Sequence, residues 1–482
     1  MRPAYTGSQV RAAEAPLLEE GQGPALMARA ARGLELAVAR DLKSTRGRVH
    51  GTHVAAVVGK GNNGGDALFA LAGLARRGVR ATAVLAHGAA HPAALEAFGR
   101  AGGRLAEPGD SLDHADAVID AVLGTGFSGV FRAPHPRPDA RVIACDVPSG
   151  LNADTGAAGP EVWRADVTVT FGALKSGLVV GRGRELAGEV EVVDIGLGPH
   201  LPDPDVRSLE PDDAARLLPA PRPDWHKYSR GVLGVVAGSR EYPGAAVLTV
   251  AGALAAGVGM VRVLAPERVR DLVLAAHPEA VGGAGRVQAW AVGPGIADDA
   301  DQHRALQSSL ASGLPVVVDA SGLGGWAADL EASGAGPDER MVLTPHAGEL
   351  AALLGSLAGG GVAPEREDIE AEPLRWARGA ARRCGTTVLL KGAATVCAAP
   401  DGTVFVQSQG HPYLATAGSG DTLTGILGAL LATASGARPV ELAALAAFVH
   451  GSAGRIAAEG GPYGAGQLAG AVREAVARLQ RG

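Results

Sequence analysis

The stretch HVAAVVGKGNNGGDALFALAGLARRGVRATAVLA, residues 53–86, changes its hydrophobic period twice. Its two ends are short apolar runs of the kind that form buried strands. The segment between them places apolar residues on one face of a helix, at Leu68, Leu71, Ala72 and Ala75. Gly78 follows two arginines, which is typical of a helix end. A strand, a helix and a second strand in this order predict a parallel sheet covered by helices.

The same alternation extends over most of the chain. Further apolar or β-branched runs occur in the first part at 116–124, 141–150 and 166–172, and in the second part at 231–239, 260–266, 287–295, 314–322, 341–349 and 387–400. Between the two series, residues 198–224 are rich in proline and aspartate, as linkers are. No repeat of fixed period relates the two parts, so we expect two different α/β domains, residues 1–205 and residues 206–482.

Composition and charge narrow the classes of function. A chain of 482 residues with 47% hydrophobic and 20% charged residues is typical of a globular protein with two or three domains. The net charge of −6 and the aromatic content of 4% argue against a nucleic-acid partner. The three cysteines are an odd number without a C-x-x-C pair, which favours a reducing, cytoplasmic compartment. Acidic residues near the N-terminus do not fit an export signal.

Two further segments need a structural interpretation. Residues 244–261 carry no charge, but they are mostly Ala, Gly and Val and lie at the short limit for a membrane span. We expect them to form a buried helix that runs into a strand, and we expect no membrane partner. Residues 357–373 are polar and rich in glycine, which favours a surface loop.

Polar residues gather where the strands of the first domain end. The segment GKGNNGGDA, residues 59–67, follows a strand and opens a helix, as glycine turns that bind phosphate do. Asn63 offers a carbonyl oxygen, which is a hard neutral ligand for a group I or II cation. Asp120 and Ser149 end two other strands, and Asp146 is a candidate general base. Each residue alone is more often a turn or cap residue, but four together at strand ends indicate a ligand site.

These segments resemble the NAD(P)H-hydrate epimerase domain over roughly residues 5–200, through VVGKGNNGGDA, DAVLGTGFSG, CDVPSGLNADTG and FGALKSGL. The resemblance implies K⁺ bound by Asn63, Asp120 and Ser149, and catalytic roles for Asp146 and Lys175. The substrate-binding residues that it implies are Asn62, Asn63, Gly64, Gly65, Asp66, Gly124, Thr125, Gly126, Phe127, Ser128, Gly129, Val130 and Asp146. The family usually has glycine where this chain has Ala67, a position where a methyl group can narrow the pocket.

Three segments of the second domain indicate a nucleotide site. Residues 235–246 form a strand, a glycine loop and the start of a helix, and Lys391 ends another strand as a point charge for phosphate. In ATAGSGDTLTG, residues 415–425, small residues precede an apolar helix, where free N–H groups and the helix dipole attract anions. Asp421 is therefore either a base beside this anion site or an N-capping residue.

The order of these segments resembles the ribokinase-like superfamily, and within it the NAD(P)H-hydrate dehydratase family, over about residues 220–480. The segments that carry it include AVGPG, VVVDASGL, LTPHAGE, LLKGAATV and ATAGSGDTLTGILGALLA. The resemblance implies that Asp421 is the base and that the hydrate also contacts Ala246, Gly295 and His346. It implies a nucleotide site made by Lys391, Gly392, Ala393, Ala394, Thr395 and Gly420, with Glu349 supporting Mg²⁺. The common GPGLG is GPGIA here and ends in Ala297.

Together the two resemblances imply one bifunctional repair enzyme. An N-terminal Rossmann-like three-layer domain would epimerise the R and S hydrates of NADH and NADPH (NADHX and NADPHX). A C-terminal ribokinase-like α/β domain would phosphorylate the ring hydroxyl of the S form with ADP and Mg²⁺, eliminate phosphate and leave AMP. Such domains commonly form homo-oligomers. The alternative is a kinase of a small vitamin-precursor alcohol with a non-catalytic, nucleotide-binding N-terminal domain, because the same fold serves such kinases.

Overall fold

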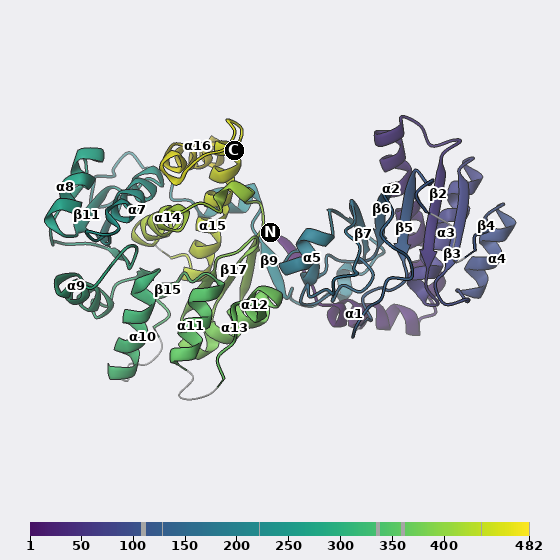
Figure 1. Ribbon diagram of the computed structural model, residues 1–482, viewed down its shortest axis with the longest axis horizontal. Helices are drawn as coiled ribbons and strands as arrows, with labels where there is room; N and C mark the ends of the chain where they lie inside the picture. The colour runs from purple at the N-terminus through teal and green to yellow at the C-terminus, as the bar shows by residue number, and fades with distance from the viewer. Residues whose placement is uncertain are drawn as a thin grey trace. The chain divides into compact units, whose positions relative to one another are not determined.

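The structure is a computed structural model that describes residues 1–107, 112–127, 129–220, 222–333, 338–357, 362–434 and 436–481. The chain divides into two compact units, of which the first is Pro3–Asp205 and the second is Val206–Gly482 together with Met1–Arg2 (Figure 1). Within the described residues, no helix is both long enough and apolar enough to cross a membrane. The uncharged segment 244–261 is covered by helix α7 (Pro243–Ala255) and the start of strand β11 (Met260–Leu264), which confirms a helix that runs into a strand.

The sheet of the first unit is parallel, with the strand order β4-β3-β2-β5-β6-β7-β8 among the described residues. Its strands are β2 (His53–Val58), β3 (Arg80–Leu85), β4 (Arg104–Leu105), β5 (Ala117–Ala121), β6 (Arg141–Cys145), β7 (Val167–Phe171) and β8 (Glu189–Val193). Its helices are α1 (Gly7–Glu19), α2 (Gly23–Arg46), α3 (Asn62–Arg76), α4 (Pro92–Arg100) and α5 (Gly181–Leu186), with 3-10 turns η1 (Ser176–Leu178) and η2 (Gly198–His200).

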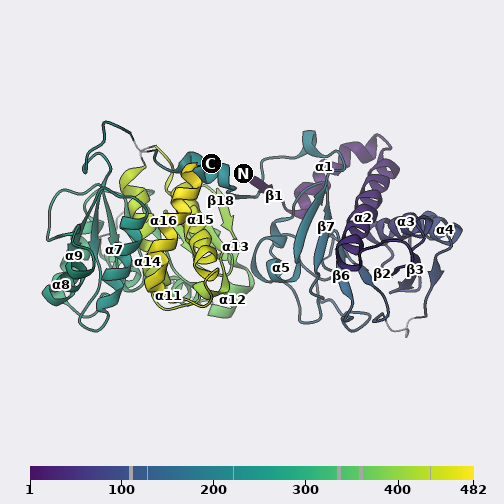
Figure 2. The same cartoon turned by 90° about the horizontal axis from the view of Figure 1, so that it is seen from above.

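Both faces of this sheet are buried, as the near-continuous apolar strands predict. Val54, Ala56 and Val58 of β2 belong to a core cluster with residues of α1, α2, α3 and α4, and α2 and α3 lie side by side over that face (Figure 2). The alternate residues Ala55 and Val57 pack on the other face, against loop residues that include Leu112 and Trp163. Because both faces are covered, a polar ligand can reach the strands only at their ends, and open α/β sheets bind ligands at the carboxyl ends.

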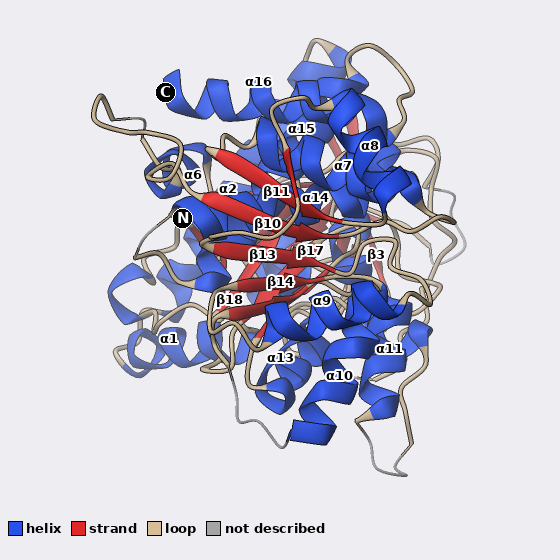
Figure 3. Ribbon diagram, turned by 90° about the vertical axis from the view of Figure 1, so that its left-hand side faces the viewer, coloured by secondary structure: helices blue, strands red, loops and turns tan. Residues whose placement is uncertain are grey.

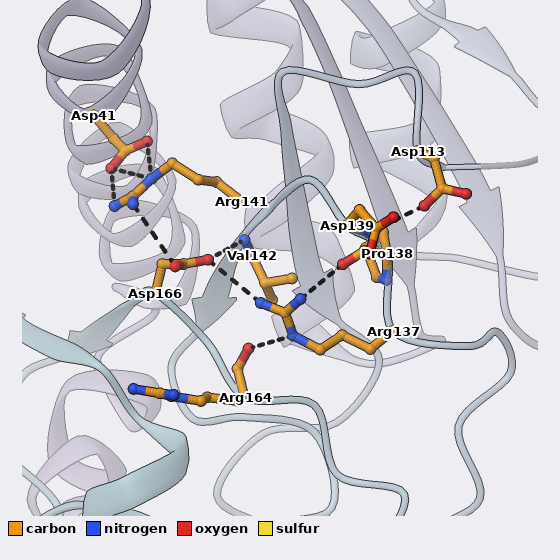
Figure 4. A network of polar contacts seen from close by, with 9 residues as sticks. All are labelled: Asp41, Asp113, Arg137, Pro138, Asp139, Arg141, Val142, Arg164 and Asp166. Carbon is orange, nitrogen blue, oxygen red and sulfur yellow. Dashed lines mark hydrogen bonds and ion pairs between the residues drawn. The ribbon is translucent and has the colours of Figure 1, made fainter.

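A network of ion pairs holds the amino ends of β6 and β7 (Figure 4). Arg141, the first residue of β6, donates hydrogen bonds to both carboxylate oxygens of Asp41 on α2, at 2.6–3.0 Å. The same guanidinium lies 3.7 Å from Asp166, which also accepts the N–H of Val142 at 2.9 Å. Arg137 lies 3.6 Å from Asp166. The network therefore fixes these strands from the edge opposite to their carboxyl ends.

The second unit has a larger, mostly parallel sheet, which Figure 3 shows between helices on both faces. Among the described residues its strand order is β1-β9-β18-β17-β16-β15-β14-β13-β10-β11-β12. The strands are β1 (Arg2–Ala4), β9 (Val206–Ser208), β10 (Val232–Val236), β11, β12 (Val281–Gly282), β13 (Ala289–Val292), β14 (Val316–Val318), β15 (Met341–Leu343), β16 (Thr387–Leu390), β17 (Thr395–Ala398) and β18 (Val404–Gln407). The helices are α6 (Pro211–Leu217), α7, α8 (Glu267–Ala276), α9 (Ala300–Leu310), α10 (Ser321–Ser333), α11 (Ala347–Ser356), α12 (Arg366–Ala371), α13 (Pro373–Cys384), α14 (Ser419–Thr433), α15 (Pro439–Ala458) and α16 (Leu468–Arg481), with turns η3 (Pro412–Leu414) and η4 (Ala465–Gln467).

The α/β class predicted for both parts is confirmed, but two local predictions are wrong. The linker-like segment 198–224 contains β9 and α6, and the predicted surface loop 357–373, of which 358–361 lie outside the described residues, contains α12. Both helices begin at a capping box, in which an aspartate accepts the N–H of a glutamate three residues earlier, so polar residues here start helices. The apolar run 387–400 contains two antiparallel strands, β16 and β17, and Lys391 directly follows the first of them, as predicted.

Candidate active sites at the carboxyl edges of two sheets

Three of the residues predicted at the strand ends of the first unit form one connected cluster. Ser149 donates its backbone N–H to Asp120 Oδ2 at 2.8 Å. The Ser149 hydroxyl accepts the N–H groups of Val122 and Leu123 at 3.1 and 3.0 Å. Asn63 joins the cluster because its side-chain amide donates to the Leu123 carbonyl at 3.0 Å. The structure therefore brings Asn63, Asp120 and Ser149 together at the edge where β5, β6 and α3 meet.

The oxygens of this cluster fit a cation. The side-chain carbonyl oxygen of Asn63 is buried and has no hydrogen-bond partner among the described residues. Asp120 is 3% exposed, and burial raises the pKa of its carboxyl group although the bonds from Ser149 oppose the shift. A cation here would give the Asn63 oxygen a partner and would favour the charged form of Asp120. The Ser149 hydroxyl already accepts two N–H groups, so it is less open to a cation than the other two.

Asp146 follows β6 in a backbone conformation that is unusual for its residue type. Its φ of 67° is left-handed, which costs a residue with a side chain roughly 1–2 kcal/mol. Carboxylate oxygen Oδ1 accepts hydrogen bonds from Lys175 Nζ at 2.6 Å and Thr170 Oγ1 at 3.2 Å. The other oxygen, Oδ2, faces the glycine loop, since a Cβ on Gly124 would lie 3.5 Å from it. One oxygen is thus fixed by the protein and the other is directed toward the predicted substrate loop.

Lys175 is 1% exposed, and its ammonium group is fully occupied. Besides Asp146, it donates to Thr170 Oγ1 at 2.9 Å and to the Phe171 carbonyl at 2.7 Å. An ammonium group has three N–H donors, so none is left for a substrate. Lys175 can therefore influence a substrate only through Asp146, as a positioning residue.

Two further carboxyl groups interact with Asp146. Asp66 of α3 is 7% exposed, and one of its oxygens has no partner among the described residues. Burial first, and then the charges of Asp146 and Glu14, raise the pKa of Asp66 well above its ordinary range. Glu14 of α1 also has a raised pKa because it is partly buried, although Lys175 opposes the shift. Sequence analysis missed Glu14, since it lies on an N-terminal helix without any motif.

The other residues predicted to bind the first substrate differ in exposure. Gly64 and Gly65 are buried, and a Cβ on Gly64 would collide with the Gly59 carbonyl oxygen, so the first turn of α3 requires glycine there. By contrast, Asn62, Gly126, Gly129 and Val130 are exposed, while Gly124, Thr125 and Phe127 are partly buried; Ser128 lies outside the described residues. Ala67 is fully buried in the core cluster, so its methyl group packs into the core.

In the second unit, the predicted anion site is the N-terminus of α14. Gly418 is the N-cap with a φ of 88°, and no side chain caps the helix. The backbone N–H groups of Gly420 and Asp421 have no backbone partner within the described residues. Asp421 is the third residue of the helix, so the N-capping interpretation is wrong. A carboxylate and two free N–H groups point to the same end of one helix, an arrangement that can hold an anion.

Lys391 lies at this anion site. A Cβ on Gly420 would be 3.5 Å from Lys391 Nζ, which places the ammonium group next to the first turn of α14. Its partners are Asp319 Oδ1 at 2.7 Å and Glu349 Oε2 at 3.4 Å. Burial would lower the pKa of Lys391, but these two carboxylates raise it above its ordinary value. Burial and the charge of Asp319 raise the pKa of Asp421 to about 6, against the opposing effect of Lys391.

The predicted hydrate-binding residues of the second unit lie on neighbouring elements. His346 is the N-cap of α11, where Nδ1 accepts the Glu349 N–H at 3.1 Å, and its side chain is 59% exposed. Gly295 has a φ of 64° and lies against the start of α7, since a Cβ would be 2.6 Å from that of Ala245. Ala246 is fully buried, so it supports the site from behind and offers no exposed surface.

The turn between β16 and β17 presents the other predicted nucleotide residues. Gly392 and Ala393 are exposed, Ala394 is buried, and Thr395 is partly buried at the start of β17. Like Lys391, they follow the carboxyl end of β16, which is the edge where ligands bind in α/β sheets.

Three site residues were not predicted from the sequence. Asp319 follows β14, and its carboxylate contacts Lys391 and Thr424. His450 of α15 lies 3.1 Å from the Ser419 hydroxyl, and burial lowers the pKa of its imidazole to about 4. The strand-end position of Asp319 in VVVDASG is a signal that could have found it. Thr424 and His450 lie within apolar helices and carry no such signal.

Comparisons with known proteins agree with this geometry. A family described as NAD(P)H-hydrate dehydratase matches residues 233–473, and one described as YjeF-related protein N-terminus matches residues 23–177. The chain is 45% identical over 447 residues to the bifunctional NAD(P)H-hydrate repair enzyme Nnr of Mycobacterium tuberculosis, covering 90% of each chain. It is 33% identical to the Escherichia coli protein of the same description, covering 84% of this chain and 81% of that one. A crystal structure of the ADP/ATP-dependent NAD(P)H-hydrate dehydratase from Bacillus subtilis, co-crystallized with ATP and Mg²⁺, matches with a TM-score of 0.50 at 26% identity, covering 57% of this chain and 99% of that chain.

Proposed function

The chain belongs to the family of bifunctional NAD(P)H-hydrate repair enzymes, and we propose that its two sheet-edge sites divide the two reactions between its two units. The first unit would carry the epimerase and the second unit the dehydratase. The division is supported by the family matches, which fall on residues 23–177 and 233–473, within the respective units. Each unit also has its own core and its own set of polar residues at strand ends.

The observation that carries the dehydratase proposal is the position of Asp421 beside two free N–H groups and Lys391. Asp421 takes the proton from the ring hydroxyl of the S hydrate, which makes that oxygen able to attack the terminal phosphorus of ADP. The N–H groups of Gly420 and Asp421 stabilise the negative charge on the transferred phosphoryl group. The bond between the terminal phosphorus and AMP breaks as the new bond forms, so AMP is the nucleotide product. Elimination of phosphate, with loss of a proton from the neighbouring ring carbon, then restores the ring double bond.

Further residues of the second unit bind the two substrates. Lys391 and the turn Gly392–Thr395 hold the phosphates of ADP, and Gly295 and His346 contact the hydrate. Mg²⁺ bound with the nucleotide would neutralise phosphate charge, and Glu349, whose carboxylate lies 3.4 Å from Lys391 Nζ, would support it.

For the epimerase, we assign the base to Asp146 Oδ2. Lys175 and Thr170 hold the other oxygen, so the free one keeps its direction toward the glycine loop. Burial and its carboxyl neighbours raise the pKa of Asp66 well above its ordinary range, so Asp66 is the carboxyl group of this site that we assign as hydrogen-bond donor to the substrate. Residues 62–66 and 124–130 form the rest of the pocket. K⁺ would be held by Asn63 and Asp120 with Ser149 behind them, and would supply fixed positive charge beside the nucleotide.

One assay tests both activities. Purified protein is mixed with R and S NADHX, K⁺, Mg²⁺ and ADP, and the NADH absorbance band is followed together with AMP and inorganic phosphate. We expect complete conversion of both epimers with one AMP and one phosphate for each NADH. Conversion that stops at the S fraction would reject the proposed epimerase activity. If conversion is complete with K⁺ but stops at the S fraction when tetramethylammonium replaces K⁺, the result would support the proposed K⁺ site. A phosphorylated alcohol in place of free phosphate would instead identify a kinase.

The proposal also includes the compartment and the oligomeric state of the protein. The three cysteines of the chain are free and buried, which supports a reducing, cytoplasmic compartment. The resemblance to both families supports a homo-oligomer, which light scattering coupled to size exclusion tests directly.

A further inference from the structure

Asp319 has a place in the second site that neither the motifs nor the proposed reaction assigns. It follows β14 and is 1% exposed, so its carboxylate is withdrawn from water. Oδ1 accepts a hydrogen bond from Lys391 Nζ at 2.7 Å, and Oδ2 accepts one from Thr424 Oγ1 at 2.7 Å. Thr424 is fully buried on α14, three residues after Asp421. One carboxylate therefore joins the lysine of the turn after β16 to the helix that bears the base.

Hydrogen bonds and one strained residue also fix the backbone around Asp319. The next residue, Ala320, has a φ of 48°, which is left-handed and unfavourable for a residue with a side chain. The Asp319 N–H donates to the Val292 carbonyl at 3.0 Å, and its carbonyl accepts the Gly322 N–H at 2.9 Å. A Cβ on Gly420 would lie 3.9 Å from Asp319 Oδ2, so the carboxylate lies close to the anion site. Backbone strain of this kind persists where the surrounding structure requires one exact side-chain placement.

We propose that Asp319 is a positioning residue of the dehydratase site, which holds the Lys391 ammonium group for the ADP phosphates and ties it, through Thr424, to the helix that carries Asp421. This inference rests on the dehydratase function proposed for the second unit. Of the two carboxylates that contact Lys391 among the described residues, the loss of Asp319 would leave the more distant one, Glu349, and Lys391 would lose its fixed distance from the first turn of α14.

A purely structural role explains the same contacts poorly. A buried ion pair adds little net stability, because removing both charges from water offsets most of their attraction. Asp319 also places a negative charge beside Asp421, and together with burial this charge raises the pKa of the base to about 6. The other charged or titratable groups around the base are Lys391, which opposes the shift, Glu349 beyond that lysine, and His450, which contacts Ser419 of the same helical turn.

The test is Asp319→Asn, which keeps the shape of the side chain and removes its charge. We expect the KM for ADP to rise about tenfold, because Lys391 loses its charged partner. We also expect the acidic limb of the kcat/KM profile, which reports the base, to move about one pH unit downward as the neighbouring negative charge disappears. Asp338→Asn is the matched control, since Asp338 is paired with Arg340 before β15 and has no contact with the site.

A second variant keeps the proposal testable if Asp319→Asn does not fold, which circular dichroism and thermal melting would reveal. Thr424→Val breaks the tie to α14 but leaves the Asp319 charge, so the KM for ADP should rise while the acidic limb stays in place. Wild-type values of both quantities in a folded Asp319→Asn protein would overturn the proposal, and so would an unchanged KM for ADP in Thr424→Val. Absence of any ADP-dependent conversion by the wild-type protein would instead reject the dehydratase function on which the inference rests.

Discussion

At the scale of single residues, Asp421 links catalysis to stability through its raised pKa. Burial and Asp319 move this pKa from 3.8 to about 6, so the folded chain binds the proton more tightly than the unfolded chain does. The stability that this proton contributes is present at low pH and is lost as the pH rises through about 6. At pH 8, Asp421→Asn should therefore raise the free energy of unfolding of the second unit by about 2 kcal/mol while it abolishes dehydration.

Denaturant unfolding at pH 8 and at pH 4.5 measures this effect, and the gain should shrink at the lower pH. Asp338→Asn is the opposite case, because its hydrogen bonds with Arg340 outweigh partial burial and lower the pKa of Asp338. That substitution should cost stability at pH 8. If Asp421→Asn instead destabilised the protein at pH 8, the folded structure would stabilise the charged carboxylate of Asp421, and the prediction would be wrong.

The sequence predicted the residues of the two sites unevenly, for a physical reason. Asn63, Asp120, Asp146 and Ser149 were found because each follows an apolar run, and parallel strands bring their carboxyl ends to one edge. Partners that come from elsewhere in the chain have no such signal. Thr170, which lies within β7, donates a hydrogen bond to Asp146, and Glu14 on α1 interacts electrostatically with the same carboxylate. The spacing of residues in the sequence likewise does not show that all three N–H donors of the Lys175 ammonium group are used within the protein.

At the scale of elements, the second site depends on how closely α14 approaches α7. The two helices meet through glycines, because a Cβ on Gly425 would collide with the Thr249 carbonyl and one on Gly252 with the Thr422 carbonyl. Gly425→Ala should therefore displace α14, lower the free energy of unfolding by about 1–3 kcal/mol and reduce dehydratase activity. Thermal unfolding and the ADP-dependent assay measure the two effects.

The matched control is Gly470→Ala on α16. Gly470 is exposed, and a Cβ there would meet nothing within 4 Å. Alanine in an exposed helix is roughly 0.5–1 kcal/mol better than glycine, so this substitution should stabilise the protein and leave the activity unchanged. If Gly425→Ala and Gly470→Ala changed the free energy of unfolding in the same direction, the close contact between α14 and α7 would not explain the effect of Gly425→Ala.

The elements that could be predicted were those with a continuous apolar run. The predicted runs contain β2, β3, β5, β6 and β7 in the first unit, because these strands are buried on both faces. The edge strand β8 was missed, since Glu189–Val193 alternates charged and apolar residues and its pattern is short. The capped helix α6 was missed because its start is made by proline and acidic residues, which also mark linkers.

At the scale of the whole molecule, the two reactions depend on separate structures. Each unit has its own sheet, and the core clusters of the two units share no residue. The residues of each site come from one unit only. A substitution in one site is therefore expected to leave the other reaction intact, apart from the supply of hydrate, which can pass through solution.

This independence gives the last prediction. With R and S NADHX, Asp146→Asn should convert only the S fraction, because the R form is no longer epimerised on the time scale of the assay. Asp421→Asn should release no NADH, although chromatography should show that it still equilibrates the two epimers. Equal amounts of the two variants, mixed, should restore complete conversion. Asp139→Asn, which removes an exposed carboxylate before β6 at the opposite edge, should behave like the wild-type protein. If the mixture of variants stopped at the S fraction, hydrate would have to pass between two sites of the same chain, and the units would not be independent.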